Sequence, residues 1–87
     1  MEVKIYEVYL YIKCLEPDDY LNLGEWRTGY EDTFATKQSA IRVCQSKFAK
    51  QPLNAYVIAV HTVVTEVTIT EKGRTASKII YNKFKKR

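Results

Sequence analysis

The chain has 87 residues, of which 46% are hydrophobic and 28% are charged, and this composition is typical of a folded domain rather than of a disordered segment. No apolar run approaches the roughly 20 residues that a membrane-spanning helix needs. The first residues alternate in polarity and lack the pattern of a signal peptide. We therefore expect one domain over residues 1–87, located in the cytoplasm.

The residues that carry chemistry in other proteins are few and scattered here. Cys14 and Cys44 fall on expected core faces, which favours buried, reduced thiols over nucleophiles. Two cysteines and the single histidine, His61, do not have the spacing of a zinc site. General acid–base catalysis needs partner groups within reach of the histidine, and the sequence shows none. We expect no catalytic residue, no metal and no cofactor, and a protein that is not an enzyme.

Residues 2–14 alternate between uniformly apolar and mixed positions with a period of two, which predicts a β-strand. The apolar set is expected to face the core. It comprises Tyr6, Val8, Leu10, Ile12 and Cys14. The mixed set, which is rich in tyrosine, is expected on the opposite face. It comprises Val3, Ile5, Glu7, Tyr9, Tyr11 and Lys13.

Residues 26–34 alternate again and predict a second strand, antiparallel to the first, with Trp26, Tyr30 and Phe34 on one face. Gly29 inside this strand indicates a β-bulge or a close approach of another backbone. Residues 15–25 between the two strands contain turn formers and acidic side chains. They are expected to form a solvated connection.

The clearest helix signal lies between Thr36 and Gln51. Thr36 is expected to cap the first turn, and Pro52 prevents continuation because it lacks a backbone N–H. Apolar residues recur at helical spacing on one stripe. These residues are Ala40, Ile41, Cys44 and Phe48. Cys44 and Phe48 are expected to be nearly fully buried.

Two further segments follow the helix. Both alternation phases are apolar between Tyr56 and Val60, which is typical of a central strand buried on both faces. The stretch to residue 70 exceeds common strand lengths, so a bend or bulge is expected near residues 61–65. Gly73 is expected to take a positive φ in a turn. For residues 75–86, a strand to about Asn82 followed by a frayed basic tail at 83–87 is favoured over a helix.

These elements predict an α+β fold in which a small antiparallel sheet of about four strands, in the order β-β-α-β-β, packs on a single helix. One helix covers only one face of such a sheet. The other face is expected to expose more apolar and aromatic surface than suits a monomer. Its expected members are Val3, Ile5, Tyr9, Tyr11, Val57, Ala59, Ile79 and Tyr81.

Two interpretations of this uncovered face remain open. In the first, it is buried by a partner protein or by a second copy in a C₂ homodimer, with Tyr9, Tyr11 and Tyr81 as interface residues. Alternatively, its tyrosines stack on unpaired bases, as aromatic side chains do on sheet-based RNA-binding modules.

The charge distribution is uneven along the chain. Residues 72–87 hold 7 of the 14 Lys and Arg residues and none of the 10 Asp and Glu residues. Such an asymmetry indicates either a polyanionic partner or a solubilising terminus. If the partner is nucleic acid, we expect the contacts to come from basic side chains in this segment. These are Arg74, Lys78, Lys83, Lys85, Lys86 and Arg87.

The leading functional hypothesis is a small binding or regulatory protein that docks on nucleic acid or on a protein complex that carries it. The alternative is a protein–protein adaptor or inhibitor of the kind encoded by phages or mobile elements, which acts through the tyrosine-rich face. Salt dependence separates the two, because phosphate-mediated binding weakens steeply as salt rises.

Overall fold

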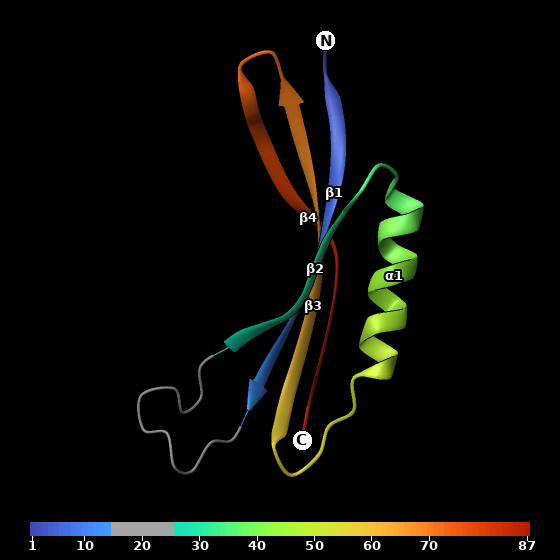
Figure 1. Ribbon diagram of the computed structural model, residues 1–87, viewed down its shortest axis with the longest axis vertical. Coiled ribbons are helices and arrows are strands. Elements are labelled where there is room, and N and C mark those ends of the chain that lie inside the picture. Colours follow the sequence, from blue (N-terminus) through green and yellow to red (C-terminus); the bar gives the residue numbers. More distant parts are fainter. Residues whose placement is uncertain (15–25) are drawn as a thin grey trace.

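The computed structural model describes residues 1–14 and 26–87, and its elements follow the predicted order β-β-α-β-β (Figure 1). The elements are β1 (Val3–Cys14), β2 (Trp26–Phe34), α1 (Lys37–Lys50), β3 (Val57–Thr70) and β4 (Gly73–Lys86). The four strands form one antiparallel sheet in the order β2-β1-β3-β4. The predicted α+β class is therefore confirmed. The connection expected at residues 15–25 lies outside the described residues.

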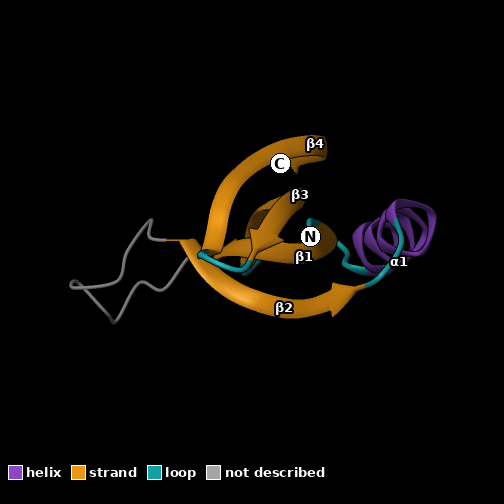
Figure 2. Ribbon diagram, turned by 90° about the horizontal axis from the view of Figure 1, so that it is seen from above, coloured by secondary structure: helices purple, strands orange, loops and turns teal. Residues whose placement is uncertain are grey.

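The molecule is elongated, with extents of 50 × 26 × 15 Å, and its sheet is strongly twisted. Viewed from above, β2 and β4 curve away on either side of β1 and β3, and α1 lies on one side (Figure 2). The β3–β4 hairpin and the N-terminus extend beyond the helix at one end of the long axis, and the C-terminus lies toward the other (Figure 1). No helix in residues 1–14 and 26–87 is long and apolar enough to cross a membrane.

Small side chains bring α1 close to the sheet. Ala40 and Cys44 are fully buried and form the core cluster with Val8 of β1 and Val64 of β3. The predicted cap is confirmed, because the Thr36 hydroxyl accepts a hydrogen bond of 3.2 Å from the backbone N–H of Ser39. The helix ends at Lys50, two residues before the proline.

The expectation that Phe48 is nearly fully buried is wrong. Phe48 lies in the last turn of α1 and is only half-buried. The ammonium groups of Lys83 and Lys85 lie 6.0 and 4.5 Å from the centre of its ring. The side of the ring that faces β4 is thus covered by lysine side chains of the sheet rather than by apolar core.

A β-bulge at Gly29 turns Trp26 to the face of the sheet opposite α1. Leu10 pairs with Tyr30, and the next residue of β1, Tyr11, pairs with Thr28, so Gly29 is left without a partner. A methyl group at Gly29 would lie 3.0 Å from Leu10 Cδ2, so the position is tight for any larger residue. Tyr30 and Phe34 lie on one face, as predicted, and this face packs on the core, but the placement of Trp26 on the same face is wrong.

A second extra residue, Ile80, has the same effect in β4. Val64 pairs with Tyr81 and Thr65 with Ile79, so every residue of β4 beyond Ile80 changes face relative to a regular strand. The placement of Tyr81 on the uncovered face is therefore wrong. Tyr81 packs against the core cluster under α1, where its hydroxyl is buried without a hydrogen-bond partner among the described residues.

The bulge expected near residues 61–65 thus lies in the partner strand, while β3 itself runs unbroken from Val57 to Thr70. β4 also continues to Lys86, so the expected end near Asn82 and the frayed tail are wrong. Residues 83–86 pair with residues 59–62 of β3. The expected positive φ at Gly73 is confirmed at +96°.

The central position of β3 explains its apolar sequence. Val60, Thr62 and Val64 are fully buried, and by their pairing they lie on the side of the sheet that α1 covers. Val63 and Val67 point to the opposite side and are also buried. We call this opposite side the open face, because no helix among the described residues covers it. It presents the residues that form the candidate site.

Candidate nucleic-acid interface

Four ring side chains from all four strands gather at one end of the open face. We call them the aromatic cluster, and they are Tyr11, Trp26, His61 and Phe84. The centre of the His61 ring lies 6.5 Å from that of Tyr11, 6.3 Å from that of Trp26 and 6.0 Å from that of Phe84. Trp26 and Phe84 are 6.2 Å apart at an angle of 60°. These edge-to-face arrangements are favourable for aromatic pairs and hold the rings in place.

Strand pairing explains how side chains so distant in sequence meet. His61 pairs with Tyr11 on one side and with Phe84 on the other, so these three rings form a row across β1, β3 and β4. Trp26 stands in the next row, opposite Lys13, and its ring reaches over the central strands toward Phe84. Ala59 occupies β3 in that same row, and its single methyl group leaves room for the indole.

The aromatic cluster is accessible. Trp26 is 42% exposed and Phe84 is 54% exposed, although large apolar side chains are usually buried. Tyr11, Trp26 and His61 line an open depression of about 250 Å³. Tyr9 extends the ring surface, because it stacks on Tyr11 at 5.9 Å with an interplanar angle of 8°.

Charged groups divide the open face into two parts. The Lys13 ammonium lies 6.0 Å from the Trp26 ring, and Lys86 stands in the same row, paired with Ala59. Toward the middle of the face, burial, Glu7 and Glu31 raise the pKa of Tyr9. The aromatic end of the face therefore carries lysine ammonium groups, whereas the region around Tyr9 carries carboxylates.

The structure distributes the six predicted basic residues over separate surfaces. Arg74 forms an ion pair of 2.7 Å with Glu7. Lys83 and Lys85 lie on the α1 side, against Phe48. Arg87 donates a hydrogen bond of 2.9 Å to the carbonyl oxygen of Asn54. These four side chains do not form one patch with the aromatic cluster.

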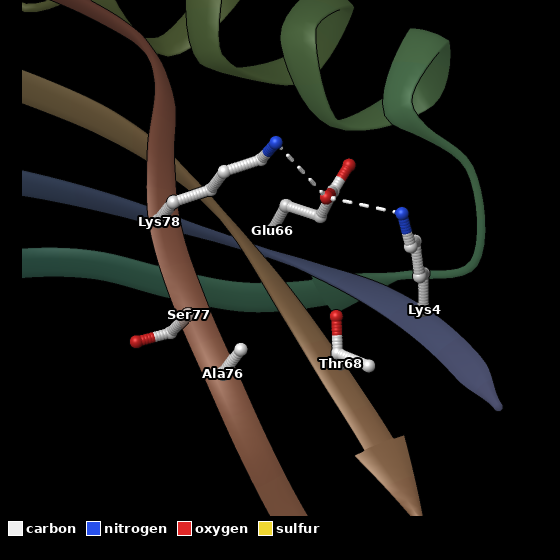
Figure 3. Close-up of a pocket in the computed structure, with 6 residues that line it drawn as sticks. All are labelled: Lys4, Glu66, Thr68, Ala76, Ser77 and Lys78. Atoms are coloured by element: carbon white, nitrogen blue, oxygen red, sulfur yellow. Dashed lines mark ion pairs between the residues drawn. The ribbon is translucent and has the colours of Figure 1, made fainter.

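Lys78 belongs to a second depression, of about 190 Å³, on the α1 side of the projecting hairpin (Figure 3). The Glu66 carboxylate lies 3.5 Å from the Lys4 ammonium and 3.8 Å from that of Lys78. Figure 3 shows the two ammonium groups on either side of this carboxylate. The three side chains join β1, β3 and β4 where α1 does not cover the sheet, which is the arrangement of a structural ion-pair network.

Lys86 is therefore the one predicted basic residue that shares a row of the open face with Trp26. Of the predicted interface tyrosines, Tyr9 and Tyr11 lie on the open face and Tyr81 does not. Four residues that were not among the predicted interface residues complete the site. They are Lys13, Trp26, His61 and Phe84. Gly29 was the sequence signal that could have placed Trp26 on the open face, because one extra residue in a strand reverses the faces of the residues beyond it.

The described residues of the site present ring faces and ammonium groups. Around His61, the described residues supply only ring contacts. Among residues 1–14 and 26–87, no three His, Cys, Asp or Glu side chains gather closely enough to hold a metal ion. Comparison with protein-family models, with curated protein sequences and with solved structures found no match.

Proposed function

We propose that this protein is a non-enzymatic binding protein whose open face docks on single-stranded nucleic acid, either free or carried by a protein complex. The observation that supports this function is the exposure of Trp26 and Phe84 beside Lys13 and Lys86. Aromatic side chains beside a positive track are the usual means of binding unpaired strands, because every base has a face that can stack.

The polarity of the face also limits the bound segment. Phosphates are attracted to Lys13 and Lys86 but repelled by Glu31, while Glu7 is paired with Arg74. We therefore expect a short footprint at the aromatic end rather than a strand that runs the length of the sheet. Duplexes should bind more weakly, because their bases are already stacked and paired.

Binding is tested by fluorescence anisotropy with labelled single-stranded RNA and DNA over a range of salt concentrations. Two phosphate contacts predict a slope of log affinity against log salt of about −1.4, and losing both lysines should bring it near zero. The variant Lys13→Met/Lys86→Met is compared with Lys37→Met/Lys72→Met, which removes the same charge at the start of α1 and at the hairpin turn. Phe84→Ala should weaken binding by roughly 1–3 kcal/mol through lost stacking.

Absence of binding to any single strand at low salt would refute the proposal. Equal losses in the two double-lysine variants would also contradict it, since they would show a general charge effect rather than contacts at the cluster. In either case, the protein-adaptor hypothesis takes first place.

A protein partner is the second candidate, and the other end of the open face favours it. Val3 is 50% exposed and Ile79 is 60% exposed there, beside Glu7 and its ion pair with Arg74. Exposed apolar side chains rimmed by charge are typical of protein interfaces and of homodimers. Sedimentation velocity of the wild type and of Val3→Ser/Ile79→Ser distinguishes self-association through this end from a monomer.

A further inference from the structure

We propose that the depression lined by Tyr11, Trp26 and His61 accepts one unpaired nucleobase and distinguishes between bases by hydrogen bonding. This inference rests on the proposed function and makes it more specific. Stacking and phosphate contacts alone do not read sequence. A base preference requires polar groups aimed at the edge of the base.

The size of the depression favours a single base. Its volume of about 250 Å³ is below the roughly 300–1,000 Å³ of pockets that hold drug-sized ligands. Its described walls come from three strands, β1, β2 and β3, and are ring surfaces. A flat aromatic ligand can stack on one of these rings and meet the edges of the others, which is the same geometry that the rings adopt among themselves.

No described residue competes with a ligand for the polar atoms of His61 and Trp26. Neither the His61 ring nitrogens nor the Trp26 N–H has a hydrogen-bond partner among the described residues, although Tyr11, Trp26 and Phe84 surround the imidazole. A neutral imidazole offers one donor and one acceptor, and an indole offers one donor. A base that forms hydrogen bonds with these groups should bind more tightly than a base that leaves them unpaired, because unpaired polar groups are costly once water is excluded.

The lysines explain why a base is favoured over an organic cation. Aromatic cages also bind quaternary ammonium groups, and Tyr, Trp and Phe rings are the usual walls. Here, however, Lys13 lies 6.0 Å from the Trp26 ring and Lys86 stands across the same row. These ammonium groups repel a cation but attract the phosphates on either side of a bound nucleotide. The arrangement therefore suits a base with its flanking phosphates.

The test uses the intrinsic fluorescence of Trp26, which is the only tryptophan of the chain. Short strands that are abasic except for one guest base are titrated against the full-length protein, with a fully abasic strand for comparison. Binding should quench Trp26 only when a guest base is present. The four guest bases should differ in affinity by at least about fivefold, the lower end of the usual cost of a mismatched contact.

Two variants locate the discrimination. His61→Phe keeps a ring but removes the hydrogen-bonding nitrogens, so it should bring the four guest bases within about twofold of one another while retaining affinity for the abasic strand. Thr65→Val removes a hydroxyl from the same face of β3, outside the depression, and should preserve the base preference. Circular dichroism checks that both variants are folded.

The outcomes separate the two proposals. If no strand binds, both the proposed function and this inference fail. If strands bind with the expected salt slope but all guest bases bind alike, only the base-discriminating site is refuted. If the abasic strand also binds as tightly as the others, the stacking on which the proposed function rests is refuted as well. The panel on the unmodified protein decides this even if His61→Phe does not fold.

Discussion

Lys85 joins the end of β4 to the end of α1, and its replacement tests the finding that the C-terminal residues are part of the fold. Its ammonium donates a hydrogen bond of 2.8 Å to the carbonyl oxygen of Phe48 and lies 4.5 Å from the Phe48 ring. This carbonyl belongs to the last turn of the helix, where the Gln51 backbone N–H lies 3.4 Å from it and the macrodipole favours a positive charge.

Lys85→Met keeps the aliphatic stem and removes the charge, so packing changes little. A hydrogen bond from a charged group contributes about 1.5–3 kcal/mol when shielded, and a cation–π contact about 0.5–1 kcal/mol at an exposed site. Lys85 is only half-buried, so water replaces part of the lost interaction. We expect the free energy of unfolding to fall by about 1–2 kcal/mol.

Urea unfolding followed by circular dichroism measures this loss. Lys86→Met is the matched control, because its side chain lies on the open face, and it should change stability by less than about 0.5 kcal/mol. A double-mutant cycle with Phe48→Leu isolates the ring contact, with an expected coupling near 0.5 kcal/mol. If Lys85→Met is as stable as Lys86→Met, residues 83–87 behave as a frayed tail and the reasoning is refuted.

Three further predictions concern the bulges and the core. Gly29→Val should cost about 1–3 kcal/mol, because its side chain meets Leu10 at a distance already tight for a methyl group, and it should also lower Trp26-dependent binding. Tyr81→Phe should raise the free energy of unfolding by up to about 1 kcal/mol in urea titration, since it removes a buried hydroxyl without a described partner; a loss would show that this hydroxyl is satisfied. Burial raises the pKa of the Cys44 thiol in the folded protein. The contribution of the protonated thiol to the free energy of unfolding is therefore complete below the unfolded pKa of about 8.5 and is lost as pH rises through the raised folded pKa. Stability should therefore fall above about pH 8.5, and Cys44→Ala should flatten that decline.

The fold follows from local patterns that the sequence states clearly. Three patterns each specify one element without reference to the others. They are the alternation of residues 2–14, the capped apolar stripe that begins at Thr36 and the segment near Val60 that is apolar in both phases. Chain order and a single helix then restrict the arrangement to a sheet covered on one side. Such patterns depend on the period and propensity of each element, and they predict the element correctly as long as it is regular.

The site depends instead on where the elements are irregular. One extra residue, Gly29, moves Trp26 from the core face to the open face, and another, Ile80, moves Tyr81 the opposite way. Because side-chain direction in a strand has a period of two, one inserted residue reverses everything beyond it. Gly29 indicates the first bulge in the sequence, whereas its fit over Leu10 and the bulge at Ile80 depend on contacts with the neighbouring strand that the alternation does not show.

The same reversal determines which charges can act together. The sequence places six cations within 14 residues, and their proximity along the chain indicates one binding surface. In the strand that they form, Lys85 faces α1 and Lys86 faces the aromatic cluster, so adjacent positions serve different purposes. Lys13, from the first strand and far away in sequence, is the cation that stands with Lys86 across the ring of Trp26. If this protein binds nucleic acid as proposed, its salt dependence should follow these two lysines on the open face rather than the net charge of the C-terminal segment.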